Sequence, residues 1–212
     1  MGNVYQRQWV AGLGLTGPVV EIGSRLVADD PDFYDYRALF PTQAYVGIDI
    51  EAGQGVDVVA DLATGTGGAA LAPYWGQAQT LLCLSTLEHV PTPWTLAAAM
   101  TALLAPQGTL VLSVPFAWVL HDYPSDYWRF SPSAVRVLFP DLVFDEARSC
   151  WQSGTGRTAP LADEAPVRLA TVLRQGRVMV EGRAVSDVYL CQPGSFLGEG
   201  VMLNMVGRRG GA

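Results

Sequence analysis

The chain has 212 residues and a formal net charge of −7 at neutral pH, and half of its residues are hydrophobic. This length and composition suit one globular domain around a single core and exclude a wholly disordered chain. The acidic balance argues against binding of bulk nucleic acid, because neutralising phosphates requires clustered Lys and Arg. All 13 basic residues are arginines, which excludes a Schiff-base lysine and a phosphate-loop lysine.

The sequence contains no signal for a membrane or for secretion. The apolar stretch at 108–120 is too short to span a bilayer and is interrupted by Pro115. The first nine residues lack the apolar run of a secretion signal. We therefore expect a cytoplasmic protein without a membrane segment.

Short β-branched runs alternate with helical or loop segments through the first half of the chain, which is typical of βαβ units around a parallel sheet. The predicted strands of this part are 19–23, 44–49, 56–61, 80–85 and 109–114. The fourth is apolar almost throughout, as a central strand is. Between the last two strands, Thr92 as a cap, Pro93 in the first turn and good helix formers over 94–104 predict a helix.

The second half follows a different pattern. Its expected elements are a helix over 131–138 and strands at 142–144, 177–181, 185–191 and 200–206. The stretch 153–166 reads as loop because of its Gly, Ser and Pro content. We therefore predict one domain over 1–212, with a core at 18–151 and 200–208 and a β-rich insertion at 152–199. The apolar strands of this insertion offer an oligomer interface.

Cysteine and histidine spacing gives no sign of a metal site. The three cysteines, Cys83, Cys150 and Cys191, are scattered and odd in number, so neither a disulfide framework nor a local zinc motif is expected. The two histidines, His89 and His121, lack metal-site spacing to each other or to a cysteine. We therefore expect no structural metal.

The residues that end the first four strands are the candidate binding residues, since ligands of open α/β sheets lie beyond the carboxyl ends of the strands. They are Glu21, Gly23, Ser24, Asp49, Ile50, Asp61, Leu62, Ser85 and Thr86. Gly23 lets the backbone turn tightly and lets a ligand approach closely. A single acidic residue at a strand end is usually a solvated cap, but a series of them in order points to a ligand site.

These strand ends resemble successive motifs of one large enzyme family, the class I S-adenosylmethionine-dependent methyltransferases. The runs that carry the resemblance are 20–23 (Val-Glu-Ile-Gly), 47–49 (Gly-Ile-Asp), 59–62 (Val-Ala-Asp-Leu), 87–90 (Leu-Glu-His-Val) and 103–116. The run His121–Phe130 resembles a segment that recurs in a bacterial and phage-like branch of small methyltransferase domains. The resemblance covers about residues 18–145 and 200–206, and it does not specify a substrate.

The resemblance implies a doubly wound, mostly parallel, seven-stranded Rossmann-like sheet with an antiparallel last strand. It also implies S-adenosyl-L-methionine as cofactor, with Glu21 and Gly23 flanking its methionine part. Asp49, beside Ile50, would hold the ribose, and Asp61 with Leu62 the adenine. Ser85 and Thr86 would line the floor beside the sulfonium.

The chain departs from the family pattern after the first strand. The family usually has further glycines there, whereas this chain continues with Ser24, Arg25 and Leu26. Ser24 would then donate hydrogen bonds to the cofactor. His89, just after the fourth strand, caps the following turn, contacts the cofactor or serves as a general base for the acceptor.

A methyl acceptor that is a hydroxyl or a protonated amine needs a general base. We predict that His121 faces the acceptor and that Asp122 or Asp126 orients it. The alternative is that the aromatic residues around them simply cover the core. Arg129 is expected to pair with Asp126 rather than to reach an anionic acceptor.

The predicted function is methyl transfer from S-adenosylmethionine to a small molecule, a sugar or a protein. A nicotinamide-dependent oxidoreductase is disfavoured, because the chain lacks a Gly-x-Gly-x-x-Gly turn after the first strand. A non-catalytic binding or assembly protein that keeps the fold is the alternative, because fold alone does not establish activity.

Overall fold

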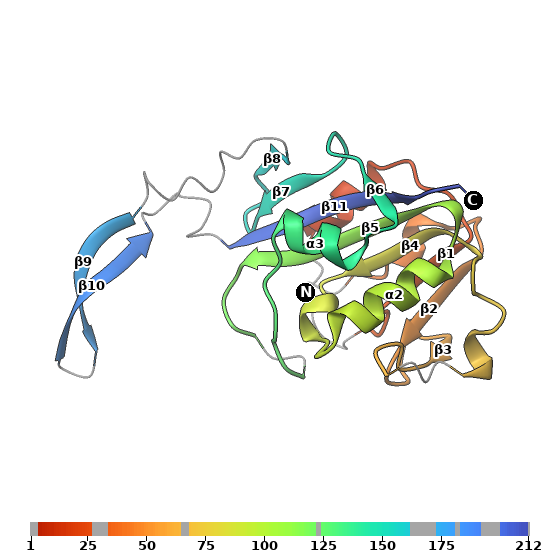
Figure 1. Cartoon of the computed structure of the whole chain (residues 1–212), viewed down its shortest axis with the longest axis horizontal. Coiled ribbons are helices and arrows are strands. Elements are labelled where there is room, and N and C mark those ends of the chain that lie inside the picture. The colour runs from red at the N-terminus through yellow and green to blue at the C-terminus, as the bar shows by residue number, and fades with distance from the viewer. Residues whose placement is uncertain are drawn as a thin grey trace.

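The computed structural model describes residues 4–26, 34–64, 68–121, 124–161, 173–180, 183–191 and 200–211, and the two segments 173–180 and 183–191 by their backbone. A nine-stranded mixed sheet forms the centre of the fold (Figure 1). Its strands are β1 (Val19–Ile22), β2 (Tyr45–Asp49), β3 (Val58–Val59), β4 (Ala78–Leu84), β5 (Leu104–Ala117), β6 (Leu142–Phe144), β7 (Cys150–Ser153), β8 (Thr158–Pro160) and β11 (Val201–Arg209).

The strand order is β3-β2-β1-β4-β5-β11-β7-β8, with β6 also pairing with β11. Strands β1 to β5 are parallel to one another, and β11 runs antiparallel to β5. Strands β2 and β3 therefore lie on one side of β1, and strands β4 and β5 lie on its other side. The order reverses between β1 and β4, and this reversal is where open α/β sheets bind ligands.

The doubly wound sheet with its antiparallel last strand is confirmed, whereas the expected count of seven strands is wrong. Two short strands, β6 and β7, both pair with β11, β6 along 207–209 and β7 along 201–204. The position beside β11 is thus shared by two strands. The strand β8 then adds to the outer edge of β7, where the sequence predicts loop.

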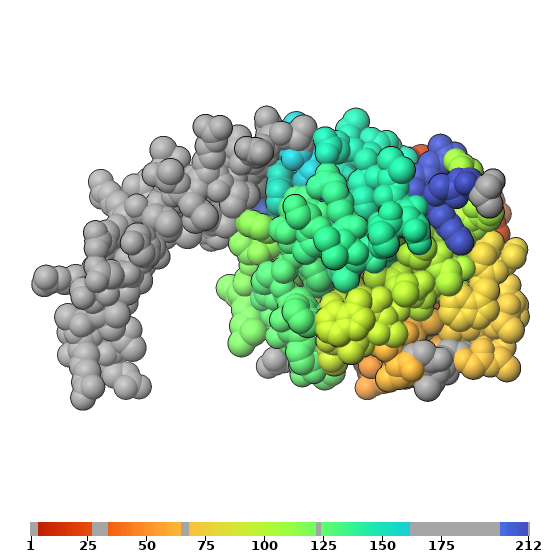
Figure 2. All heavy atoms as spheres, in the orientation of Figure 1, coloured from red at the N-terminus to blue at the C-terminus, as the bar shows by residue number. Residues whose placement is uncertain are grey.

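Helices cover both faces of the sheet. The longer ones are α1 (Val4–Ala11), α2 (Pro93–Leu103) and α3 (Pro132–Leu138), and the single 3-10 turns are η1 (Tyr36–Leu39), η2 (Ala69–Leu71) and η3 (Leu87–His89). Helices α2 and α3 pack on one face of the sheet, and in Figure 2 their atoms lie side by side on the surface of that face. Val10 of α1, Tyr36 of η1 and Phe40, the residue after η1, belong to a second apolar cluster.

Side chains of β4 point alternately to the two faces of the sheet, so this strand contributes to both apolar clusters. Leu81 and Cys83 belong to the larger cluster with α2, and Leu82 and Leu84 belong to the cluster with α1. Successive side chains of a strand point to opposite faces. A central strand between two helix layers is therefore apolar on both faces, and β4 is apolar over 81–84, in agreement with the almost wholly apolar strand that the sequence predicts.

Several local features differ from the sequence-based expectations. Helix α1 has no counterpart among the predicted elements, and β3 is shorter than the expected 56–61. Thr92 takes the N-cap position of α2, but its hydroxyl donates to the carbonyl of Ala63 instead of capping the helix. Ser131 does cap α3, because its hydroxyl accepts a hydrogen bond from the amide of Ala134.

The second sheet of the structure is a two-stranded antiparallel pair, β9 (Leu173–Val180) with β10 (Arg183–Cys191). These strands agree with the two strand-like runs predicted there. None of the helices in the described ranges has the length and apolar character needed to span a bilayer.

Candidate functional site

The chain turns sharply at Gly23, at the carboxyl end of β1. Its φ is +75°, and a Cβ built there would lie 2.2 Å from Oγ1 of Thr86, the residue that follows the end of β4 by two positions. Only glycine avoids both the left-handed strain and this clash. Gly23 and Thr86 therefore meet at the point where the strand order reverses.

Asp49, the last residue of β2, holds the two neighbouring loops together. Its Oδ2 accepts the backbone N–H of Arg25 at 3.0 Å, and its Oδ1 accepts that of Glu51 at 3.1 Å. The side chains of Arg25 and Glu51 also form an exposed ion pair at 3.1 Å. Ile50, beside Asp49, is 59% exposed at this edge.

The remaining residues predicted for this edge take different places. Oδ1 of Asp61 accepts the amides of Ala63 and Thr64, which turns the chain after β3. Leu62 is buried in the main core cluster. Ser24 is also buried, and its Oγ lies 2.6 Å from a Cβ built at Gly47 of β2, with no hydrogen-bond partner among the described residues.

Glu21 is a buried carboxyl group within β1. Its Oε2 accepts a hydrogen bond of 2.7 Å from the hydroxyl of Tyr45, the first residue of β2. Burial raises the pKa of Glu21 to about 7, against the opposing effect of the Tyr45 hydrogen bond. Burial in low dielectric disfavours the charged form of a carboxyl group.

A second group of polar residues lies beyond the ends of β4 and β5. Ser85 has a φ of +52°, and its hydroxyl accepts a hydrogen bond from the Gln6 amide of α1 at 3.4 Å. Residues from α1, η3, β5, β11 and the segments after β4 and β5 line a recess: Gln6, Ser85, Glu88, Pro115, Trp118, His121 and Met202. The recess therefore lies next to the point where the strand order reverses, on the side of β4 and β5.

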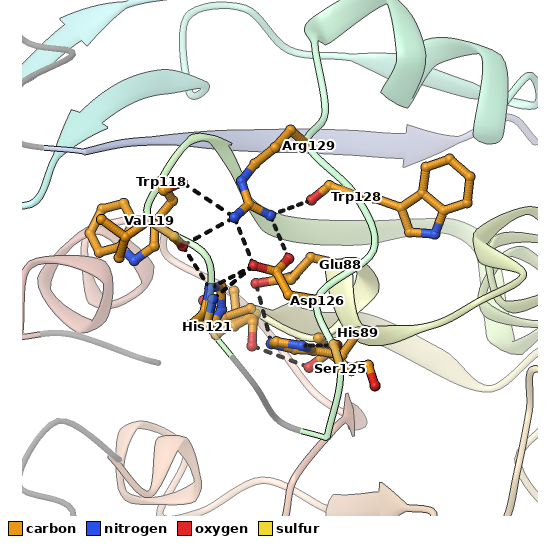
Figure 3. Close-up of polar contacts among 12 residues, drawn as sticks. Glu88, His89, Trp118, Val119, His121, Ser125, Asp126, Trp128 and Arg129 are labelled. Carbon is orange, nitrogen blue, oxygen red and sulfur yellow. Dashed lines mark hydrogen bonds and ion pairs between the residues drawn. The ribbon is translucent and has the colours of Figure 1, made fainter. Parts of the chain in front are cut away.

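Asp126 and Arg129 hold the chain that follows β5 (Figure 3). The Arg129 guanidinium donates to both carboxylate oxygens of Asp126, at 2.5 and 2.7 Å, although the Asp126 side chain has no exposed surface. Arg129 also donates to the carbonyls of Trp118, Val119 and Trp128. Bonding to Arg129 holds the pKa of Asp126 well below its usual range, so the expected pairing of Asp126 with Arg129 is confirmed.

Asp126 also contacts His121. Its Oδ2 accepts the backbone N–H of His121 at 3.0 Å and lies 3.1 Å from Nδ1 of the His121 ring. The other predicted partner of this histidine, Asp122, lies outside the described residues. Nδ1 of His121 also lies 3.2 Å from the carbonyl oxygen of Val119, so among the described residues Asp126 and Val119 both contact this side of the His121 ring.

His89 and Glu88 complete this group (Figure 3). The His89 ring meets the His121 ring edge-to-face, with centroids 4.9 Å apart, and its Nδ1 lies 2.8 Å from the carbonyl oxygen of Ser125. Nε2 of His89 is 3.9 Å from Oε1 of Glu88. Burial raises the pKa of Glu88 to about 7 and lowers that of His89.

The sequence predicts a place for His89 at the cofactor, and it does not predict contact between His89 and His121. The two histidines are 32 positions apart in the chain, and their contact depends on the chain after β5 crossing back over η3. Gln6 was missed because α1 carries no motif. Glu88 belongs to the Leu-Glu-His-Val run, so its residue type and position were visible but its burial was not.

No protein-family model and no curated protein matches this sequence. Solved structures do match the fold. A protein of Bacillus halodurans described as a candidate methyltransferase aligns with a TM-score of 0.58 at 14% identity, over 96% of this chain and 97% of that one. The chain has the methyltransferase fold.

Two further matches are to enzymes solved with S-adenosylhomocysteine. The 1,6-didemethyltoxoflavin-N1-methyltransferase of Burkholderia thailandensis has a TM-score of 0.52 at 16% identity, over 97% of this chain and 76% of that one. The N-methyltransferase NodS of Bradyrhizobium japonicum has a TM-score of 0.50 at 14% identity, over 98% and 88%. These likenesses confirm the predicted fold class and leave the acceptor open.

The Asp126–Arg129 pair gives the first testable prediction. Replacing Arg129→Leu leaves a buried carboxylate without its cation, and we expect the free energy of unfolding to fall by about 3–5 kcal/mol. The matched control is Arg136→Leu, because Arg136 pairs with Glu146 on the surface, where such pairs contribute about 0–1 kcal/mol. Urea unfolding measures both, and equal losses in the two variants would contradict the role given to Arg129.

Glu21 gives a pH-dependent prediction. Its folded-state pKa lies above the ordinary value of 4.5, so its contribution to stability is fully present below pH 4.5 and is lost as the pH rises through 7. Between pH 5 and 8 the wild type should lose about 2–3 kcal/mol that a Glu21→Gln variant keeps. Urea unfolding of both proteins across this range tests the shift, and parallel pH profiles would refute it.

Proposed function

We propose that this chain is an S-adenosylmethionine-dependent methyltransferase. The observation that carries the proposal is the placement of Gly23, Asp49 and Asp61 at the carboxyl ends of the adjacent strands β1, β2 and β3, next to the reversal of strand order. The solved relatives of this fold that bind S-adenosylhomocysteine support it.

The residues at this edge fit a nucleoside cofactor. The Asp49 carboxylate accepts two backbone N–H groups, and a carboxylate offers about four lone-pair positions, so two remain for the ribose hydroxyls. Asp61 would accept the adenine amino group. Because Leu62 lies in the core, the exposed Ile50 is the apolar side chain that would pack on the adenine.

The methionine part would lie along Glu21, Gly23, Ser85 and Thr86. Ser24 would reach it only after turning away from Gly47, because its hydroxyl now faces β2. When bound, the cofactor supplies a methyl group on a sulfonium. The protein then has to align the acceptor and exclude water, and such alignment contributes about 7–11 kcal/mol in well-oriented reactions.

The recess beyond β4 and β5 is the proposed acceptor site. His121 lines it and would take a proton from the acceptor at Nε2, because Asp126 engages its Nδ1 side. Asp126 acts as the positioning residue and, held ionised by Arg129, would stabilise the imidazolium that forms. The acceptor that we favour is a small molecule, a sugar or a protein.

The cofactor site is tested by calorimetric titration of the purified chain with S-adenosylhomocysteine. We expect micromolar binding by the wild type and at least a tenfold loss in Asp49→Ala, because the ribose hydroxyls lose their acceptor. The control is Asp145→Ala, which removes a carboxylate that caps the turn after β6. Absence of binding by the folded wild type would favour the non-catalytic alternative, with the Ser24–Leu26 loop as the cause.

The acceptor site is tested with an acceptor found by screening for transfer of a labelled methyl group. We expect His121→Ala to lower the rate by about 10²–10⁴, the usual contribution of a general base, while affinity for S-adenosylhomocysteine stays unchanged. An unchanged methylation rate would remove His121 from the mechanism.

A further inference from the structure

We infer that Glu88, His89 and His121 form a binding site for a divalent transition-metal ion of the Zn²⁺ type. One potential ligand atom of each residue lies within 4.8 Å of the other two. Glu88 and His89 come from η3, and His121 comes from the chain after β5 (Figure 3). Two imidazole nitrogens and one carboxylate are a ligand set that zinc and iron(II) sites share.

The carboxylate of Glu88 supplies an independent reason to expect a ligand. Its side chain is 1% exposed, and its Oε2 has no hydrogen-bond partner among the described residues. A buried polar atom without a partner is costly, and each instance in a native structure requires an explanation. Glu88 and His121 both line the recess, and a cation held between Glu88 and the two histidines would give this carboxylate a partner.

Both histidines already have the outer contacts that metal ligands need. Histidines that bind metals usually donate the other ring N–H to a carbonyl or a carboxylate, which fixes the tautomer. Nδ1 of His89 has the carbonyl of Ser125 at 2.8 Å, and Nδ1 of His121 has Asp126 Oδ2 at 3.1 Å. The Nε2 atoms of both rings are therefore left to bind an ion.

The donor set also selects the class of ion. Mg²⁺ and Ca²⁺ prefer oxygen ligands throughout, whereas imidazole suits Zn²⁺ and Fe²⁺. In a tetrahedral site, ligand bonds of about 2.0–2.1 Å place two ligand atoms about 3.4 Å apart. The present ligand atoms lie within 4.8 Å of one another, so binding would draw the three side chains together by up to about 1.4 Å and would leave the fourth coordination position for water or substrate.

One consequence rests on the proposed function. A bound ion would occupy Nε2 of His121, and the acceptor would then lose its proton through polarisation by the ion instead of through a free imidazole. Metal binding itself does not depend on this step, so it is measured separately.

The test uses the full chain with every purification-tag histidine removed, because His89 and His121 are its only histidines. After treatment with a chelator, the protein is titrated with ZnCl₂ and, separately, with MgCl₂ by calorimetry. We expect one Zn²⁺ per chain and no Mg²⁺ binding at the same concentration. Glu88→Gln and His89→Ala should each weaken Zn²⁺ binding at least tenfold, and the exposed-site control Glu51→Gln should not.

Absence of saturable Zn²⁺ binding by the wild type, or equal affinity in wild type, Glu88→Gln and His89→Ala, would overturn the inference. Circular dichroism checks the fold of each variant, and Glu88→Gln, which keeps the side-chain shape, decides if His89→Ala does not fold. A parallel titration with S-adenosylhomocysteine separates the two proposals. Zn²⁺ binding without cofactor binding would contradict only the proposed function. Cofactor binding without Zn²⁺ binding would contradict only the metal site.

Discussion

The buried carboxylate of Asp126 holds together the part of the molecule on which the acceptor site depends. It binds the guanidinium of Arg129 with both oxygens and also accepts the backbone N–H of His121. The Arg129 guanidinium that binds Asp126 also donates hydrogen bonds to the carbonyls of Trp118 and Val119. The chain after β5 is therefore closed on itself beside η3, and this closure brings the two histidines to one point.

The fold could be predicted where burial alone determines the pattern. The strands β1, β2 and β4 lie within two residues of the predicted bounds, and β5 contains the predicted 109–114 but extends over 104–117. Their inner residues are buried, because each strand is covered by helices or by a neighbouring strand. The helix α1 has an ordinary composition, and what fixes it is a set of distant contacts, such as Gln6 with Tyr36 and with Ser85. The short strand β7 pairs with the edge of β11, and β8 pairs with the outer edge of β7, and no local signal in the sequence shows these edges.

The candidate site was predictable in its residues more than in its arrangement. The sequence predicts Asp49 at the carboxyl end of a strand, where the structure has it. The carboxyl ends of parallel strands lie on one side of the sheet, so this position follows from the strand prediction. The directions of the Ser24 and Leu62 side chains could not be predicted, because they depend on tertiary packing. Ser24 packs against Gly47, and Leu62 packs into the core. The meeting of Glu88, His89 and His121 follows from tertiary closure around Asp126, so spacing along the chain could not show it.

The central claim is that the carboxyl ends of β1, β2 and β3 hold the nucleoside part of a cofactor, and hydrogen exchange with and without S-adenosylhomocysteine tests it most directly. The amides of Arg25 and Glu51 both bond to Asp49, so they report on this edge. The account predicts slower exchange on addition of S-adenosylhomocysteine at 21–26, 47–51 and 60–64, with no change at 142–160. Unchanged exchange in those three segments, or protection confined to 142–160, would contradict it.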